Sequence, residues 1–197
     1  MNVYVWTSGV LKNAYIGEYW WKYSYDFNNA WSISQMQSDW WVFDNASDWE
    51  ITSDWFHKKS GGDQSLKVNI GNHSTSEKIT ITCNIYANTW TRNWWMTMLV
   101  GWIWCTVRAS TYSGSWWFGV ETGTNSNYNT SNLSTWSYVL QCVMDLKNKT
   151  DTASLTWKQD VSCAIADNDI TNMNEYLKIP AWWRWVYIKD ISVYVEP

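Results

Sequence analysis

The sequence predicts an all-β protein, an antiparallel β-sandwich with one or two short helices. Apolar and polar residues alternate with a period of two through most of the chain, as in strands buried on one face. Turns rich in Asn, Ser, Thr and Gly separate these runs at the short intervals typical of sandwiches. Only two segments, 30–39 and 167–179, carry a helical pattern, which argues against alternating strand-helix units.

Nine runs rich in β-branched and aromatic residues predict the strands. They are residues 23–27, 65–70, 78–87, 96–110, 117–122, 137–146, 152–157, 160–166 and 186–196. The segment KNKTD forms a turn between the sixth and seventh runs, so these two predict a β-hairpin. Asn28 and Asn29 are the candidate N-caps of the first helix.

The length of 197 residues suits one domain with a sizeable core. We divide the chain into an N-terminal arm, residues 1–21, and a sandwich domain, residues 22–197. The arm could add a strand to the sheet, pair with a neighbouring subunit to give a homo-oligomer, or dock onto a larger assembly. The sequence does not choose between these roles.

Charge and hydropathy exclude several classes of partner. The net charge is −4 and the 14 Lys and Arg residues are scattered, so we expect no nucleic acid partner. No apolar run reaches the roughly 18 residues that a membrane span needs. The N-terminus lacks a basic region followed by an apolar one, so we expect no classical signal peptide. A virion or extracellular location would then require assembly into a particle or release on lysis.

The cysteine and histidine pattern predicts neither a metal nor a cofactor. No CxxC occurs, and the cysteines lie in apolar alternating runs, which predicts free buried thiols with three disulfide pairings formally open: Cys83, Cys105, Cys142 and Cys163. His57 and His73 lack the spacing of zinc ligands, and we expect both to be solvated loop or edge residues. The acidic run 44–54 could hold calcium but lacks EF-hand spacing.

A family resemblance follows from the order of three segments. YSYDFNN (23–29) precedes a short helix, SDWW (38–41) follows it, and WVYIKDISVYVE (185–196) ends the chain. This order resembles the concanavalin A-like jelly roll of the laminin-G and lectin/glucanase type, over residues 22–197. The resemblance implies that the first strand after the arm and the last strand lie side by side. Residues 10–19, VLKNAYIGEY, are also similar to the starts of phage tail-associated proteins that carry such sandwiches.

The sequence contains few motifs that indicate catalysis. The glucanases of this fold use closely spaced acids on one strand, because retaining hydrolysis needs two carboxylates about 5 Å apart. This chain has no E-x-D-x-E cluster and no G-x-S-x-G elbow. We therefore expect a non-enzymatic protein without catalytic residues. The alternative is a glycan-active hydrolase of the glucanase fold with an unrecognised carboxylate pair.

Glycan binding has better signals, because sugars stack on aromatic rings and are fixed by Asn, Asp and Arg side chains on loops. Segments 87–95, 110–119 and 122–132 have this mix. The candidate ligand-binding residues are Trp90, Arg92, Trp94, Tyr112, Trp116 and Tyr128. In the alternative interpretation Trp95 and Trp117 are core residues and the Asn-rich loop is only solvated. The predicted function is a binding or structural module, a tail or surface adhesion accessory of a phage or virion that recognises a cell-surface glycan or another virion subunit.

Glycine is missing where turns need it. Residues 124–197 contain none, whereas average composition would give about five. Four tryptophans occupy positions that favour glycine at helix ends and turns: Trp40, Trp136, Trp157 and Trp182. Either the protein is genuinely Trp-rich, or UGA codons that encode glycine have been read as tryptophan. Under the second hypothesis Trp90, Trp94 and Trp116 would also be glycine, and the codons of the gene distinguish the two.

Overall fold

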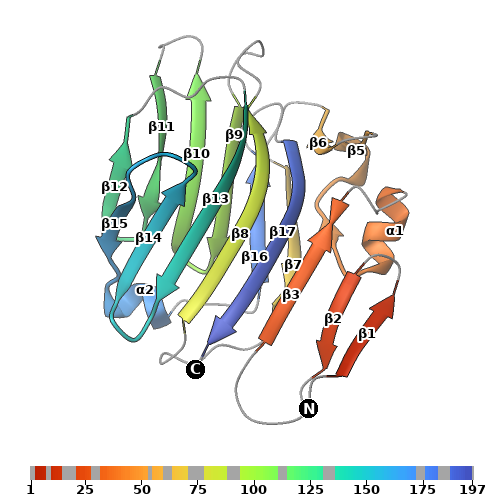
Figure 1. Cartoon of the computed structure of the whole chain (residues 1–197), viewed down its shortest axis with the longest axis horizontal. Coiled ribbons are helices and arrows are strands. Elements are labelled where there is room, and N and C mark those ends of the chain that lie inside the picture. Colours follow the sequence, from red (N-terminus) through yellow and green to blue (C-terminus); the bar gives the residue numbers. More distant parts are fainter. Residues whose placement is uncertain are drawn as a thin grey trace.

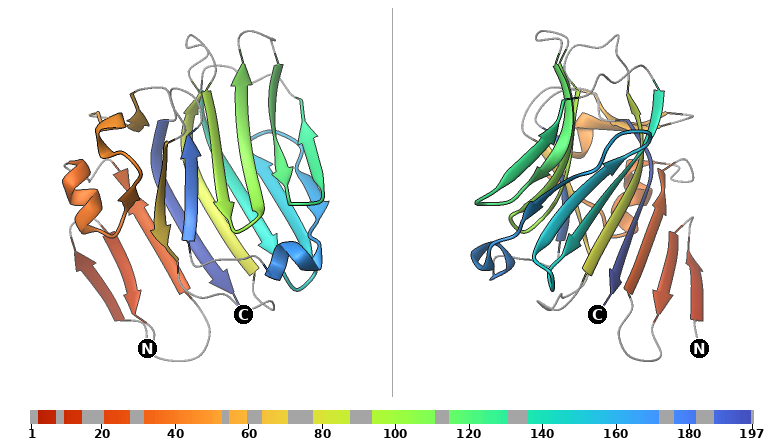
Figure 2. Two further views of the ribbon diagram at one scale, coloured as in Figure 1. Left: turned by 180° about the vertical axis from the view of Figure 1, so that it is seen from behind. Right: turned by 60° about the vertical axis from the view of Figure 1, so that its left-hand side comes forward.

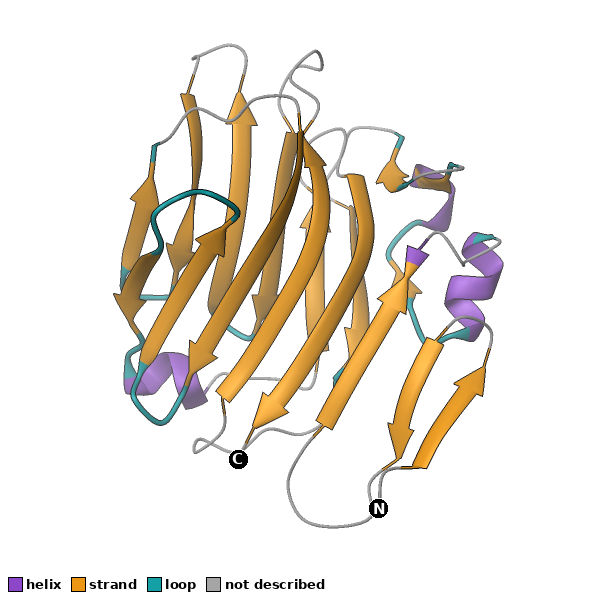
Figure 3. Cartoon of the chain, viewed as in Figure 1, coloured by secondary structure: helices purple, strands orange, loops and turns teal. Residues whose placement is uncertain are grey.

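Two antiparallel sheets stacked face to face make up the structure, a computed structural model (Figure 1; Figure 2). Two short helices, α1 (Ile33–Ser38) and α2 (Asp167–Thr171), lie at opposite sides of the sandwich (Figure 3). The described residues are 3–7, 10–14, 21–27, 32–52, 55–59, 64–70, 78–87, 94–110, 115–130, 136–171, 176–181 and 187–196. The predicted β-sandwich is confirmed. No described helix is long and apolar enough to cross a membrane.

Sheet A has ten strands, and eight of them form one continuous order. That order is β1 (Val3–Thr7), β2 (Val10–Ala14), β3 (Trp21–Asp26), β17 (Tyr187–Glu196), β8 (Lys78–Ala87), β13 (Trp136–Asp145), β14 (Thr150–Leu155) and β15 (Val161–Ala164). The short strand β6 (Phe56–Lys58) pairs with β17 and with β5 (Trp49–Ile51). The neighbouring position of β3 and β17, with Tyr25 opposite Ile191, confirms what the resemblance implied.

Sheet B has seven strands and packs its inner face against sheet A. Its order is β12 (Ser126–Asn129), β11 (Ser115–Glu121), β10 (Ile103–Ser110), β9 (Trp94–Val100), β16 (Tyr176–Ala181), β7 (Gln64–Asn69) and β4 (Val42–Phe43). The inward residues of β10 and β11, among them Cys105 and Phe118, are fully buried. Period-two alternation places the residues between them on the outer face.

The first residues of the chain extend sheet A. β1 and β2 form a hairpin, and β2 pairs with β3 through Val10 opposite Tyr25. Of the three roles considered for the arm, the structure shows strand addition to this chain's own sheet. The boundary between arm and domain at residue 21 stays a prediction.

Two element predictions were wrong for identifiable reasons. The run 96–110 is a hairpin, not one strand, because Gly101 at φ 60° opens a two-residue loop between β9 and β10. The predicted helix 167–179 ends at Thr171, and β16 follows it. Leu177 and Ile179 are buried on alternate positions of that strand. A strand explains this alternation and a helix does not.

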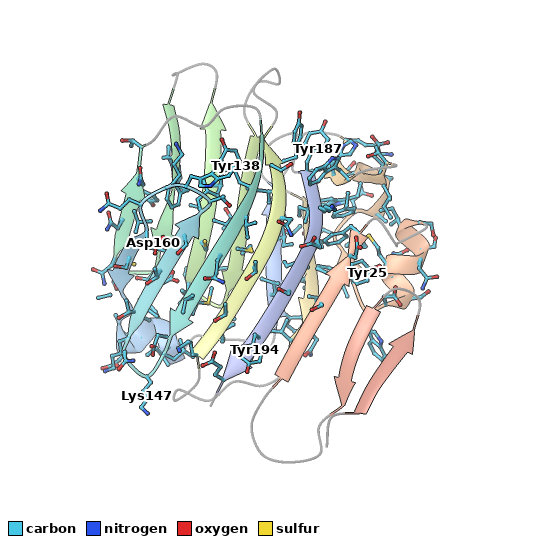
Figure 4. The ribbon with its side chains drawn as sticks, in the orientation of Figure 1. Tyr25, Tyr138, Lys147, Asp160, Tyr187 and Tyr194 are labelled. Atoms are coloured by element: carbon cyan, nitrogen blue, oxygen red, sulfur yellow. The ribbon has the colours of Figure 1, made fainter. Side chains whose placement is uncertain are left out.

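Helix α1 begins later than predicted and is capped by a different residue. Ser32 is its N-cap, and the Ser32 side chain accepts a hydrogen bond from the Gln35 backbone N–H at 3.1 Å. The proposed caps Asn28 and Asn29 lie outside the described residues. The helix anchors to sheet A through Asp39, whose carboxylate accepts a hydrogen bond from the Tyr25 hydroxyl at 3.2 Å. Tyr25 lies on the side of β3 facing α1 (Figure 4).

An aromatic cluster fills the core between α1, β3 and β6. Phe27 and Phe56 stack at 4.7 Å, Trp49 and Phe56 stack at 4.9 Å, and Trp41 packs against Phe27 at 5.6 Å. Burying each such ring contributes about 1.5–3 kcal/mol. Trp41 is 1% exposed. Trp41 is therefore an ordinary core residue at the start of the segment that follows α1.

The backbone at Trp40 and Trp157 is left-handed, with φ values of 77° and 60°. Both side chains project into solvent, at 70% and 79% exposed, so ring burial does not offset the strain of a Cβ at positive φ. Lys149 in the β13–β14 turn, at φ 54°, is the remaining positive-φ residue other than glycine within the described ranges. Trp136 begins β13 opposite Ala87 and is not left-handed. Trp182 lies outside the described residues.

Three asparagines join the two sheets along one edge. The side-chain amides of Asn125, Asn127 and Asn129 donate hydrogen bonds of 2.9, 2.9 and 3.0 Å. Their acceptors are the backbone carbonyls of Ala164, Ser162 and Gln159, on or next to β15. The spacing of two residues points all three amides toward sheet A. The Asn-rich segment is therefore a structural ladder and not a solvated loop.

A polar cluster is enclosed in the apolar interior. Asp151 is fully buried on β14, and its Oδ1 accepts a hydrogen bond from Cys142 Sγ at 3.4 Å. Asp151 Oδ2 has no hydrogen-bond partner among the described residues. Burial raises the pKa of this carboxyl to about 8. The four cysteines are free, as predicted, and burial raises the pKa of each of the three fully buried thiols.

Candidate functional site

The outer face of sheet B offers a continuous row of side chains that crosses every strand of the sheet. The strand registers align one residue from each strand, and the row runs Val42, Lys67, Lys178, Leu99, Trp104, Glu121 and Ser126. Adjacent members are directly opposed across neighbouring strands, which lie about 4.8 Å apart. A ligand on this face would therefore meet lysines at one end and a carboxylate at the other.

An aromatic and carboxylate cluster occupies the β11–β12 end of this face. The Tyr128 hydroxyl donates a hydrogen bond of 2.6 Å to Glu121 Oε2. The Tyr128 ring meets the Trp117 ring edge to face at 4.7 Å. Burial, and then the hydrogen bond to Glu121, raise the pKa of Tyr128 to about 12. At 39% exposed, the ring remains accessible to a ligand.

Gly119 allows the Tyr128 ring to lie across β11. Gly119 is opposite Tyr128 in the register. A Cβ at Gly119 would meet the Asn127 carbonyl oxygen and would lie 2.6 Å from Tyr128 Cδ1. The absence of a side chain at this position is what brings the ring close to the strand.

Replacement of Gly119 by alanine is expected to destabilise the protein by about 1–3 kcal/mol, because β12 must shift outward to make room. Denaturant unfolding followed by tryptophan fluorescence measures the loss. The shift would also lengthen the bond between Tyr128 and Glu121. An alanine variant as stable as the parent would contradict the close approach described for this strand pair.

A hollow of about 190 Å³ lies at the other end of the face. It is lined by Asp44, Ser65, Lys67, Leu99, Gly101, Tyr176 and Lys178. The Lys67 ammonium lies 5.1 Å from the centroid of the Tyr176 ring, a cation–π contact. The Ser65 backbone N–H donates a hydrogen bond of 3.0 Å to Asp44 Oδ2. β4, β7, β9 and β16 thus each contribute to, or adjoin, this hollow.

The predicted ligand-binding residues are only partly placed. Tyr128 lies in the aromatic and carboxylate cluster. Trp94 and Trp116 both align with Ala109, from opposite sides of β10, and nothing is described of their side chains. The remaining three lie outside the described residues: Trp90, Arg92 and Tyr112.

Most of the site was not predicted from the sequence. Trp117 was predicted to lie in a binding loop or in the core, whereas it lies half-buried on the outer face against Tyr128. Glu121 was not among the predicted ligand-binding residues. Alternation within WFGVE could have placed Trp117 and Glu121 on one face. Lys178 was hidden by the wrong helix prediction.

A second polar cluster lies at the β5–β6 side of sheet A, where the prediction for His57 was wrong. His57 is 3% exposed, and its Nε2 lies 2.8 Å from Glu50 Oε1. Its ring stacks on Tyr187 at 4.9 Å. Figure 4 shows Tyr187 at the end of β17 beside these strands. The register that aligns His57 with both Glu50 and Tyr187 encloses the imidazole. His73 lies outside the described residues.

Metal ligands are not gathered anywhere in the described part of the chain: no group of three or more His, Cys, Asp or Glu residues could hold an ion there. The described part of the acidic run 44–54 contains a 3-10 helix, Ala46–Asp48, and then β5 with the buried Trp49.

Comparisons with known proteins find similarity at the level of structure alone. No family model matches the sequence, and no curated protein matches it. The lectin-like defence protein arcelin-5 from Phaseolus vulgaris superposes with a TM-score of 0.55 at 10% identity, covering 89% of this chain and 98% of its own. The glucanase SCLam, a non-specific endo-beta-1,3(4)-glucanase, has a TM-score of 0.58 at 8% identity, with 95% of each chain covered. Lectin I-B4 from Griffonia simplicifolia has a TM-score of 0.55 at 9% identity, covering 88% and 99%.

These neighbours combine legume lectins and a glucanase, which share one architecture. The two stacked sheets, the pairing of β3 with β17 and the few helices agree with that architecture. This chain has the concanavalin A-like jelly-roll sandwich fold.

Proposed function

We propose that this protein is a non-enzymatic module that binds glycans through the outer face of sheet B. The observation that carries the proposal is the cluster of Tyr128, Trp117 and Glu121. Aromatic rings stack on the C–H faces of sugars, and a carboxylate fixes hydroxyl groups. Glu121 has about four acceptor sites, of which Tyr128 takes one. The fold similarity to lectins supports the same proposal.

The distribution of acidic residues supports the absence of catalysis. Glu121 is the one acidic residue in the strands of sheet B. Asp44 follows β4, which is five strands from β11 in the sheet, or about 24 Å. Asp169 of α2 reaches the β11–β12 turn, but it is 4% exposed and its Oδ2 accepts hydrogen bonds from Thr124 Oγ1 and the Ala166 backbone N–H. Retaining glycosidases need their two carboxylates about 5–5.5 Å apart. The competing proposal, a glycan-active hydrolase, would require a second carboxylate from outside these strands.

Binding is tested with a glycan array followed by calorimetry on the best ligand. We expect Tyr128→Ala and Glu121→Gln each to weaken binding at least about tenfold, a loss of about 1.4 kcal/mol. Tyr194→Ala, on the outer face of sheet A (Figure 4), is the matched control and should bind as the parent does. Unchanged affinity in both site variants would refute the proposed site. A reducing-sugar assay on the same ligand checks catalysis, and turnover lost in Glu121→Gln would favour the hydrolase.

We also propose that the module is an accessory of a phage or other virion, in its tail or on its surface. The similarity of residues 10–19 to phage tail-associated proteins supports this proposal. Among the described strands, β1 is the outermost of sheet A and pairs with β2 alone, and such an edge strand can pair with a neighbouring subunit. Tail or capsid genes on either side of this gene would support the assignment. Self-association that persists after deletion of residues 1–20 would contradict oligomerisation through the arm.

A further inference from the structure

The hollow at the β7–β16 end of the outer face has an unusual charge arrangement. Lys67 and Lys178 line the hollow and are directly opposite each other across the two strands. Like charges at directly opposed positions destabilise a sheet. Within the described residues, neither ammonium group forms a salt bridge. An anion bound between the two lysines would therefore stabilise this arrangement.

The surroundings of the two lysines favour a ligand that is partly apolar. The Lys67 ammonium lies 5.1 Å from the centroid of the Tyr176 ring, and Tyr176 is 39% exposed. Leu99 and the backbone at Gly101 form the neighbouring wall. The one acidic lining residue, Asp44, already accepts a hydrogen bond from the Ser65 backbone at one of its carboxylate oxygens. An aromatic ring beside cationic donors suits a sugar ring that carries a negative group.

The size of the hollow fits a single unit of such a ligand. Its volume of about 190 Å³ is somewhat larger than a cavity of about 150 Å³ that binds benzene, so a single six-membered ring is the scale of ligand that fits. The protein as a whole carries a net charge of −4. A cationic hollow on an acidic protein is therefore a local feature and not a consequence of general basicity.

We infer that this hollow binds the anionic group of an acidic glycan, a carboxylate or a sulfate ester, between Lys67 and Lys178. The inference rests on the proposed function and names the class of sugar. The aromatic and carboxylate cluster lies three strands from β16, at about 14 Å. One oligosaccharide can therefore contact both, with its neutral part on Tyr128 and its acidic unit in the hollow.

The test is calorimetry with four probes: a glucuronate-containing oligosaccharide, its carboxyl-reduced counterpart, a sulfated dextran oligomer and the unsulfated dextran. We expect at least one acidic probe to bind about tenfold or more tightly than its neutral counterpart, and the two pairs separate carboxylate from sulfate. Lys67→Met and Lys178→Met should remove this preference and leave binding of the neutral probes unchanged. Lys147→Met, an exposed lysine in the turn of the β13–β14 hairpin (Figure 4), is the matched control.

Stability separates a binding role of the lysines from a structural one. Lys178→Met removes a like-charge opposition, so its thermal midpoint should equal or exceed that of the parent. Lys67→Met also loses the cation–π contact with Tyr176, so the Lys178 variant is the one that separates the two roles. Equal affinity for acidic and neutral probes, or a preference that both lysine variants keep, would overturn the inference. If the inference is overturned in this way but Tyr128→Ala still weakens binding of the neutral probes, the proposed function is retained. If no probe and no array glycan binds, the proposed function and this inference are both overturned.

Discussion

The free energy of unfolding is expected to fall as the pH rises from about 4 to about 8, and Asp151→Asn is expected to remove most of that fall. Burial raises the pKa of Asp151 from 3.8 to about 8 in the folded protein. In this range the folded state keeps a proton that the unfolded state has released. The stabilisation is complete below the unfolded pKa and is lost as the pH approaches the folded one. Each unit of pKa difference corresponds to about 1.4 kcal/mol, so the full effect is on the order of 5 kcal/mol.

Urea unfolding at several pH values measures this dependence. The informative quantity is the difference between the parent and Asp151→Asn, because the other titrating groups cancel in it. Asp160→Asn, at an exposed position on the β14–β15 connection (Figure 4), is the control for loss of a carboxylate without burial. Parallel profiles for the parent and Asp151→Asn would show that the buried carboxyl is not held protonated.

Replacing Trp40 and Trp157 together by glycine is expected to stabilise the protein by about 2 kcal/mol or more. Each tryptophan holds its backbone at positive φ, which costs on the order of 1–3 kcal/mol for a residue with a Cβ. Glycine removes that cost, although it adds about 0.5–1 kcal/mol of unfolded-state entropy. Both rings are mostly exposed, so little packing is lost. Thermal or denaturant unfolding measures the gain.

The matched controls are the alanine variants at the same two positions. Alanine removes the ring but keeps the Cβ, so each glycine variant should exceed its alanine counterpart by about 1 kcal/mol. Trp102→Gly, at an exposed turn position without positive φ, should not stabilise. Glycine variants no more stable than their alanine counterparts would argue against strain at these sites. Such a result would also weaken the hypothesis that UGA codons for glycine have been read as tryptophan, which UGG codons at these positions would exclude.

Local patterns predicted the fold because the sandwich has one buried face per sheet. In β8 and β13 every second residue is buried, so period-two alternation revealed both strands with bounds within one residue. The left-handed backbone at Trp40 was predictable because a helix end requires it. The hairpin at Gly101 was missed because VGWI continues the apolar run without a polar turn.

The site was harder to predict because it depends on register between distant segments. Lys67 and Lys178 are opposed only because β7 and β16 pair, and no local pattern reports that pairing. Tyr128 was identified as an exposed aromatic residue, but its partner Glu121 and the role of Gly119 depend on the alignment of β11 with β12. The asparagine ladder likewise depends on β15 of sheet A lying beside β12 of sheet B, and no local pattern reports that contact between the sheets.

The central position of β17 has a consequence for biosynthesis. β17 lies between β3 and β8 in sheet A, yet it is translated after both. Until residues 187–196 emerge from the ribosome, β3 and β8 each expose an unpaired edge within the same sheet, and such edges promote aggregation. The long sequence separation between Tyr25 and Ile191 also raises the contact order and slows folding. Truncated translation products that stop before β17 should therefore be insoluble, and sheet A should be completed only once residues 187–196 have been synthesised.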